Sequence, residues 1–177
     1  KKNKIIKSEN TDVIPGSGVD LNKFSYSEIN FELPFSFLYL GRLIRDKGIN
    51  EYIKACIFLK SKYSKINFYI IGSPDKENLT NLSNFELNNL KENKAIEFLG
   101  FSPKPQDIIK KITCIVLPSY REGLSKSLME ACAVGRPIVT TNVPGCREIV
   151  TENKNGFLAL PKNTKSLIEC MEKIISL

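Results

Sequence analysis

The chain has 177 residues, of which 42% are hydrophobic and 25% are charged, values close to the globular average that exclude a wholly disordered or fibrous protein. The net charge of +7 suits an anionic ligand or an anionic membrane surface, whereas no nucleic-acid-binding motif is present and nucleic acid is the least favoured partner. The sequence contains no histidine, which excludes Ser-His-Asp triads and most zinc sites from this chain.

The first 33 residues are expected to lie outside the main domain. Lys1 to Lys7 is basic, Pro15 to Gly18 marks a tight loop, and residues 22–33 are typical of a surface linker. Because the chain begins at Lys1 rather than at a methionine, we expect it to be an excerpt of a longer protein. For the lysines of residues 1–7, a solvated domain edge is favoured over a peripheral membrane contact.

Residues 34–177 show strand and helix patterns in alternation. Short, nearly continuous apolar runs predict strands buried on both faces, at Phe35–Leu40, Ile66–Ile71, Ile96–Leu99, Thr113–Leu117, Pro137–Thr140 and Phe157–Leu160. Helical spacing is clear over residues 49–63, 124–132 and 167–175, and weaker over 79–91 and 105–111. This alternation predicts an α/β fold, a doubly wound parallel sheet of the Rossmann-like type.

The five cysteines indicate whether the protein lies in a reducing or an oxidising compartment. They are odd in number, form no C-x-x-C pair, and several stand inside apolar segments. Such residues are typical of a reducing environment, so we expect a cytoplasmic protein, placed at the inner face of the membrane if the membrane contact exists. No apolar run is long enough to span a bilayer, and no signal peptide is evident.

A basic turn follows the first predicted strand. In open α/β sheets, ligands bind beyond the carboxyl ends of the strands, and Gly41-Arg42 and Lys47 stand at this position. The planar fork of Arg42 and the mobile charge of Lys47 suit a diphosphate. The alternative is a solvated basic turn with Asp46 as its local partner. Neither a G-x-G-x-x-G fingerprint nor a P-loop motif is present.

A second candidate segment follows the fourth predicted strand and runs from Glu122 to Glu130. Gly123 permits a turn and Leu124 is predicted to begin a helix, so the free N–H groups of residues 123–126 would face phosphate oxygens. A carboxylate such as Glu130 can accept hydrogen bonds from two vicinal hydroxyls. The alternatives are a loop charge near the helix dipole for Glu122 and a solvated partner of Lys126 for Glu130.

A third segment, residues 137–150, is expected to add a strand, a Pro-Gly turn and another short helix. Within it Arg147 and Glu148 are expected to form a structural ion pair. The sequence has no D-x-D motif and no cluster of acids at magnesium spacing. We therefore expect no essential metal and no cofactor.

Several ordered motifs resemble those of the retaining glycosyltransferases of family 4, whose GT-B fold has two Rossmann-like domains. They are I-P-G-S-G-V-D at 14–20, G-R-L-x-x-x-K-G at 41–48, F-L-G-F at 98–101, P-S-x-x-E-G at 118–123, E-x7-E at 122–130, A-C-A-V-G-R-P-I-V at 131–139 and N-G-F-L at 155–158. The resemblance runs from about Val13 to the end of the chain. It implies that residues 34–177 are the C-terminal, nucleotide-sugar-binding half of such an enzyme, and that residues 1–33 are the tail of the missing N-terminal domain and a linker.

The resemblance also implies roles for residues at matching positions. Arg42 and Lys47 would bind the donor diphosphate, Glu122 would contact donor-sugar hydroxyls, and Glu130 would bind the ribose diol. The remaining donor-binding candidates are Gly41 beside the diphosphate, the backbone around Gly123, Leu124 and Ser125, and Phe101 and Ser102 near the base.

The implied reaction moves a hexose or N-acetylhexosamine from a nucleotide diphosphate sugar, with UDP as the expected nucleotide, to a glycan or a lipid-diphosphate-linked acceptor in bacterial surface polysaccharide or glycoprotein assembly. Because the family needs an N-terminal acceptor domain, the isolated fragment is expected to be inactive. Two alternatives stay open at this point, a non-hydrolysing UDP-sugar epimerase and a non-catalytic nucleotide-binding module.

Overall fold

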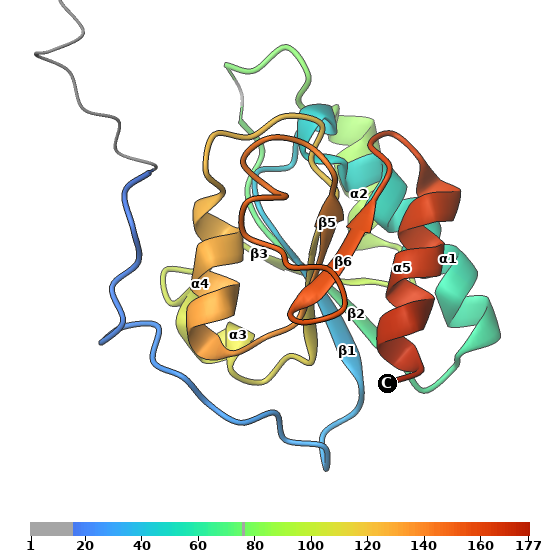
Figure 1. Cartoon of the computed structure of the whole chain (residues 1–177). Coiled ribbons are helices and arrows are strands. Elements are labelled where there is room, and N and C mark those ends of the chain that lie inside the picture. Colours follow the sequence, from blue (N-terminus) through green and yellow to red (C-terminus); the bar gives the residue numbers. More distant parts are fainter. Residues whose placement is uncertain (1–15, 76) are drawn as a thin grey trace, which may run out of the picture.

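All six apolar runs form strands, which pair in parallel in one sheet (Figure 1). The computed structural model describes residues 16–75 and 77–177. The strands are β1 (Ser36–Leu40), β2 (Asn67–Ile71), β3 (Glu97–Gly100), β4 (Cys114–Leu117), β5 (Ile138–Thr141) and β6 (Gly156–Ala159). Their order across the sheet is β3-β2-β1-β4-β5-β6, so the predicted doubly wound, Rossmann-like sheet is confirmed.

Helices cover both faces of the sheet. They are the 3-10 helix η2 (Arg45–Lys47) and α1 (Ile49–Lys62), α2 (Asn84–Lys91), α3 (Pro105–Ile109), α4 (Lys126–Val134) and α5 (Thr164–Ile175). Helices α1 and α5 pack together on one face, and α3 and α4 pack together on the other (Figure 1). None of the helices in the described ranges is both long and apolar enough to cross a membrane.

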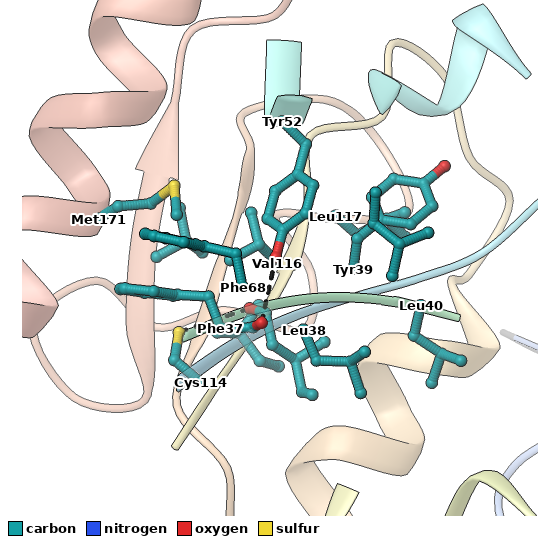
Figure 2. Close-up of a cluster of buried hydrophobic side chains, with 14 of the residues drawn as sticks. Phe37, Leu38, Tyr39, Leu40, Tyr52, Phe68, Cys114, Val116, Leu117 and Met171 are labelled. Carbon is teal, nitrogen blue, oxygen red and sulfur yellow. Dashed lines mark hydrogen bonds between the residues drawn. The ribbon is translucent and has the colours of Figure 1, made fainter. Parts of the chain in front are cut away.

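The core lies on both faces of the sheet, and one part of it fills the space between the central strands and the helices α1 and α5. Every residue of β1 and of β4 is buried. The rings of Phe37 and Phe68 stack with their centroids 5.7 Å apart, and Tyr52 on α1 lies over them (Figure 2). The Tyr52 hydroxyl donates to the carbonyls of Phe37 at 3.1 Å and Tyr69 at 3.0 Å. A buried polar group thus ties the helix to two neighbouring strands.

Two helices begin later than predicted. Helix α2 starts at Asn84 rather than at residue 79, because the Ser83 side chain accepts from the Glu86 amide while Glu86 accepts from the Ser83 amide. Helix α4 starts at Lys126 rather than at Leu124. Residues 144–149 form consecutive turns, so the short helix expected within residues 137–150 is absent.

Residues 16–28, called here the α4 strap, lie along helix α4 (drawn in blue in Figure 1). The Ser27 amide donates to the Val134 carbonyl at 3.2 Å, and the buried Arg136 guanidinium donates to the Ser27 carbonyl and hydroxyl. Phe24 is only 4% exposed and belongs to the core. The prediction of a surface linker is therefore wrong at Phe24. The basic residues 1–7 and the motif residues Ile14 and Pro15 lie outside the described part of the chain.

Candidate functional site

The order in which strands are added to the sheet changes direction between β1 and β4. The two loops that leave the carboxyl ends of these neighbouring strands therefore lie side by side. They are residues 41–48 after β1 and residues 118–125 after β4. In this fold the crevice at such a reversal is where ligands bind. The strand order therefore places the two strongest candidate segments of the sequence at one point of the molecule.

The Asp46 carbonyl holds the two loops together. It accepts from the Tyr120 amide at 2.8 Å and from the Ser119 hydroxyl at 3.2 Å. Gly48 has φ = +69°, and a Cβ at this position would lie 2.0 Å from the Pro118 carbonyl oxygen. Only glycine permits this close approach of the two backbones.

A third loop, residues 142–150, packs against the second. Gly145 has φ = +82°, and a Cβ there would lie 1.3 Å from the Gly123 carbonyl oxygen. The Gly145 carbonyl accepts from the Ser125 amide at 3.1 Å. The prediction that the N–H groups of residues 123–126 are all free for phosphate is therefore wrong at Ser125.

The first two loops enclose a cavity of ≈ 390 Å³, within the usual size range of small-ligand pockets. Arg42, Lys47, Glu122 and Gly123, which the sequence singles out, all line it. Ile44, Asp46, Asn78 and Arg121 complete the lining. The structure thus brings both predicted basic residues and the predicted carboxylate to one cavity.

Each predicted charged side chain of this cavity has a partner. Arg42 pairs with Asp75, with 2.5 Å between Nη1 and Oδ2, so Asp46 is not its ion-pair partner. Lys47 pairs with Glu122, with 2.5 Å between Nζ and Oε1, and these side chains are only 15% and 10% exposed. The two loops are therefore also joined by an ion pair that is largely removed from water.

The Arg42 backbone is fixed from inside the domain. The buried Tyr39 hydroxyl donates to the Arg42 carbonyl at 2.7 Å. Burial raises the pKa of Tyr39 well above its ordinary value, and the nearby negative charge of Glu122 adds to this effect. Tyr39 is therefore a neutral hydrogen-bond donor beneath the cavity at any physiological pH.

Glu130 lies on α4 and does not line the cavity. It is 9% exposed, so its interpretation as a solvated partner of Lys126 is wrong. Burial raises the pKa of Glu130, while the positive charges of Lys126 and Lys23 lower it. Lys23 belongs to the α4 strap, which therefore contributes to the electrostatics around this carboxylate.

The other predicted donor-binding residues lie outside the cavity lining. They are Gly41, Phe101, Ser102, Leu124 and Ser125. Phe101 and Ser102 follow β3, which is two strands away from β1 in the sheet. Leu124 packs under Gly16 of the α4 strap, where a Cβ on the glycine would meet the leucine side chain at 2.9 Å.

Sequence reasoning missed Asp75, Asn78 and Arg121. Asp75 and Asn78 follow the strand end at Gly72, but they lie beyond the residues next to the strand. Arg121 stands directly before Glu122 in the P-S-x-x-E-G motif, in one of its variable positions. The expected pair of Arg147 and Glu148 is confirmed, with 3.4 Å between Nε and Oε1. Within residues 16–75 and 77–177, no three Cys, Asp or Glu side chains gather in a way that could hold a metal ion.

The protein is an open, doubly wound α/β domain. Its cavity lies where the strand order changes direction, between β1 and β4, which is the usual position of a ligand crevice in this class. The family follows from comparison with known sequences. Residues 25–177 match the family model described as "Glycosyl transferases group 1", and the chain therefore belongs to the group 1 glycosyltransferases.

Two curated relatives show how much of a family member the chain represents. It is 29% identical over 168 residues to the capsular polysaccharide biosynthesis glycosyltransferase CapM of Staphylococcus aureus. It is 30% identical over 181 residues to the N,N'-diacetylbacillosaminyl-diphospho-undecaprenol alpha-1,3-N-acetylgalactosaminyltransferase of Campylobacter jejuni. The matches cover 90% and 96% of this chain, but only 44% of either relative.

Solved structures support the fold assignment. The C-terminal domain of the group 1 glycosyltransferase LpcC from Francisella tularensis has a TM-score of 0.76 and 24% identity, with 90% of this chain and 89% of that one covered. Anabaena HepE in complex with UDP-glucose has a TM-score of 0.72 and 20% identity, with 89% and 46% covered. The chain thus has the fold of the C-terminal domain of GT-B glycosyltransferases.

Proposed function

We propose that this chain is the donor-binding half of a retaining glycosyltransferase of family 4. Residues 34–177 form the nucleotide-sugar-binding domain, and residues 1–33 are the linker and the tail of an N-terminal acceptor domain. The donor is a UDP-linked hexose or N-acetylhexosamine, and the acceptor is a glycan or a lipid-diphosphate-linked sugar of a bacterial surface polysaccharide or glycoprotein. The proposal includes a cytoplasmic location.

One observation carries the proposal. Arg42, Lys47 and Glu122 come from two loops far apart in the sequence, and they line one cavity at the point where the sheet reverses. Two cations and a carboxylate in one small cavity suit a ligand that carries a diphosphate beside a sugar, because phosphate needs positive charge and hydroxyls need an acceptor.

The chemistry follows from where charge develops. When the bond between the sugar and the diphosphate breaks, negative charge collects on the departing phosphate oxygens. Arg42 and Lys47 would stabilise this charge, and Glu122 would orient the sugar through its hydroxyls. Removal of one such preorganised donor lowers the rate by about 10²–10³-fold in other enzymes. Attack by the acceptor hydroxyl on the same face of the sugar would give retention.

Glu130 is proposed to bind the ribose diol, with Phe101 and Ser102 near the base. These residues are not among the lining residues of the cavity, so this proposal has the nucleotide extend from the cavity toward α4 and the end of β3. Gly41 and the backbone of Gly123, Leu124 and Ser125 would hold phosphate and sugar. We propose no essential metal, since the cationic side chains would supply the positive charge.

The relatives support the substrate class. The Campylobacter relative is named as an N-acetylgalactosaminyltransferase that acts on a diphospho-undecaprenol acceptor, and the Staphylococcus relative is named for capsular polysaccharide biosynthesis. The Anabaena structure contains UDP-glucose. The family assignment favours a transferase over the epimerase and over a module without catalysis.

Calorimetric titration of the 177-residue chain with UDP tests the donor site. Arg42→Ala and Lys47→Ala should each weaken binding about ten-fold, because each removes a charge-assisted hydrogen bond. Arg147→Ala is a matched control. The side chains of Arg147 and Arg42 are 50% and 54% exposed and both are ion-paired, but Arg147 does not line the cavity. Unchanged binding by both cavity variants would contradict the assignment.

The need for an acceptor domain is tested separately. The 177-residue chain, incubated with UDP-N-acetylglucosamine or UDP-glucose and a lipid-diphosphate sugar, should transfer little or no sugar, although it binds UDP. Product analysis by mass spectrometry also reports any epimerised donor. Rapid transfer by this chain alone would overturn the division of labour between two halves, and an epimerised donor would favour the epimerase.

A further inference from the structure

Arg121 lines the same cavity as Arg42 and Lys47 but has no place in the roles given above. It is exposed and stands directly before Glu122 in the loop after β4. The Ser119 hydroxyl lies 3.2 Å from both the Arg121 carbonyl and the Asp46 carbonyl, to which it can donate. The backbone of Arg121 is therefore anchored to both loops while its side chain extends from them.

The three cations of the cavity differ in their partners. Arg42 is paired with Asp75 and Lys47 with Glu122, each at 2.5 Å. Among residues 16–75 and 77–177, no ion pair or hydrogen bond occupies the Arg121 side chain. Asp46, the remaining charged residue of the lining, forms no ion pair with it either.

This difference bears on anion binding. An anion that approaches Arg42 or Lys47 competes with a carboxylate already in contact, and the ion pair with Glu122 is also largely buried. An anion that approaches Arg121 displaces only water. A guanidinium can donate two parallel hydrogen bonds to a phosphate, so one arginine without a competing carboxylate is a strong phosphate-binding group.

We propose that Arg121 is a diphosphate-binding residue of this cavity, and that it supplies the one cation among the described lining residues which no carboxylate neutralises. The proposal rests on the proposed function, because it assumes that a diphosphate enters this cavity. Its chemistry admits two sources, the donor nucleotide and the lipid-diphosphate acceptor. The experiment below separates them.

Calorimetric titrations with UDP, uridine and geranyl diphosphate compare the unmodified chain with Arg121→Gln. UDP is the donor diphosphate, geranyl diphosphate is a short soluble substitute for the lipid, and uridine lacks phosphate. Arg121→Gln should weaken binding of at least one diphosphate about ten-fold, the scale of one charge-assisted hydrogen bond. Uridine binding should stay the same, because only the phosphate contact is lost.

Two further variants make the test specific. Arg121→Lys keeps the charge but loses the planar fork, so it should fall between the unmodified chain and Arg121→Gln. If Arg121→Gln fails to fold, as judged by thermal unfolding, Arg121→Lys decides the matter. Arg147→Gln, at an exposed arginine outside the cavity lining, should bind all three ligands as the unmodified chain does.

The outcomes distinguish this inference from the proposed function. A loss confined to UDP assigns Arg121 to the donor, and a loss confined to geranyl diphosphate assigns it to the acceptor. Equal binding of both diphosphates by Arg121→Gln and the unmodified chain would overturn the inference and leave the proposed function standing. If the unmodified chain binds neither diphosphate, both fail together.

Discussion

The ion pair between Lys47 and Glu122 allows a prediction with a worked magnitude. At 2.5 Å and an effective dielectric constant of about 20, two unit charges attract by about 7 kcal/mol before desolvation is subtracted. Moving each ion out of water costs several kcal/mol, so the net value of the pair is small, but removal of one partner from a buried pair costs about 3–5 kcal/mol. With 15% and 10% of the side chains still exposed, we expect about 3 kcal/mol, the lower end of that range.

A double-mutant cycle with Lys47→Met, Glu122→Gln and the double variant measures this coupling. Each single variant leaves one charge without its partner, whereas the double variant leaves none. The double variant should therefore be less stable than the unmodified chain by only about 1–2 kcal/mol. With about 3 kcal/mol lost in each single variant, the coupling free energy is about 4–5 kcal/mol. Urea unfolding followed by circular dichroism provides the free energies. A coupling below about 0.5 kcal/mol, the usual limit of additivity, would refute the argument that the pair is shielded from water.

Two further predictions concern the surroundings of the cavity. Burial raises the pKa of Glu130 in the folded chain, so the Glu130 carboxyl binds its proton more tightly in the folded chain than in the unfolded chain. The stability that this carboxyl contributes is therefore present below the ordinary carboxyl pKa and is lost as the pH rises through the raised pKa of the folded chain. In urea unfolding, Glu130→Gln should therefore be more stable than the unmodified chain by about 1 kcal/mol at pH 7, and equally stable at pH 3.5. The same difference in stability at both pH values would contradict the argument that burial penalises the charged form of Glu130. Gly145→Ala should destabilise the chain by more than about 2 kcal/mol through backbone strain and a clash with Gly123. Gly18→Ala is the control, because Gly18 also has a positive φ but no atom within 4 Å of its added Cβ; equal melting temperatures for the two variants would show that the clash is relieved at no cost.

The sequence predicted the elements that local patterns define. Apolar runs marked all six strands, since a strand covered on both faces must be apolar throughout. Burial on both faces was nevertheless wrong for β3, because this edge strand leaves Glu97 and Leu99 exposed. The start of α2 was predicted five residues too early, although Ser83 and Glu86 have the spacing of a capping box that marks it. The start of α4 was not, because it depends on a hydrogen bond from Ser125 to Gly145, twenty residues further along the chain.

The sequence predicted the charged residues of the candidate site but not the ion pairs that they form. Arg42, Lys47 and Glu122 follow the carboxyl ends of strands. In an open α/β sheet these ends lie together at the edge where ligands bind, so the three residues could be predicted to lie near one another. Partners across loops depend on tertiary contacts, so the ion pair between Arg42 and Asp75 was missed. Arg121 was missed because a charged residue in a loop is usually solvated, and its position in the cavity lining emerges only from the assembled loops.

The separation of the two loops in sequence has a consequence for folding. Lys47 and Glu122 are 75 residues apart, and β2 and β3, which lie between β1 and β4 in the sequence, pair on the other side of β1. Contacts between segments so distant form slowly, because closing the long intervening segment costs conformational entropy before the contact rewards it. A refolding protein would thus acquire its affinity for a nucleotide only when the two halves of the sheet have joined, and a fluorescent nucleotide would serve as a probe of that final step.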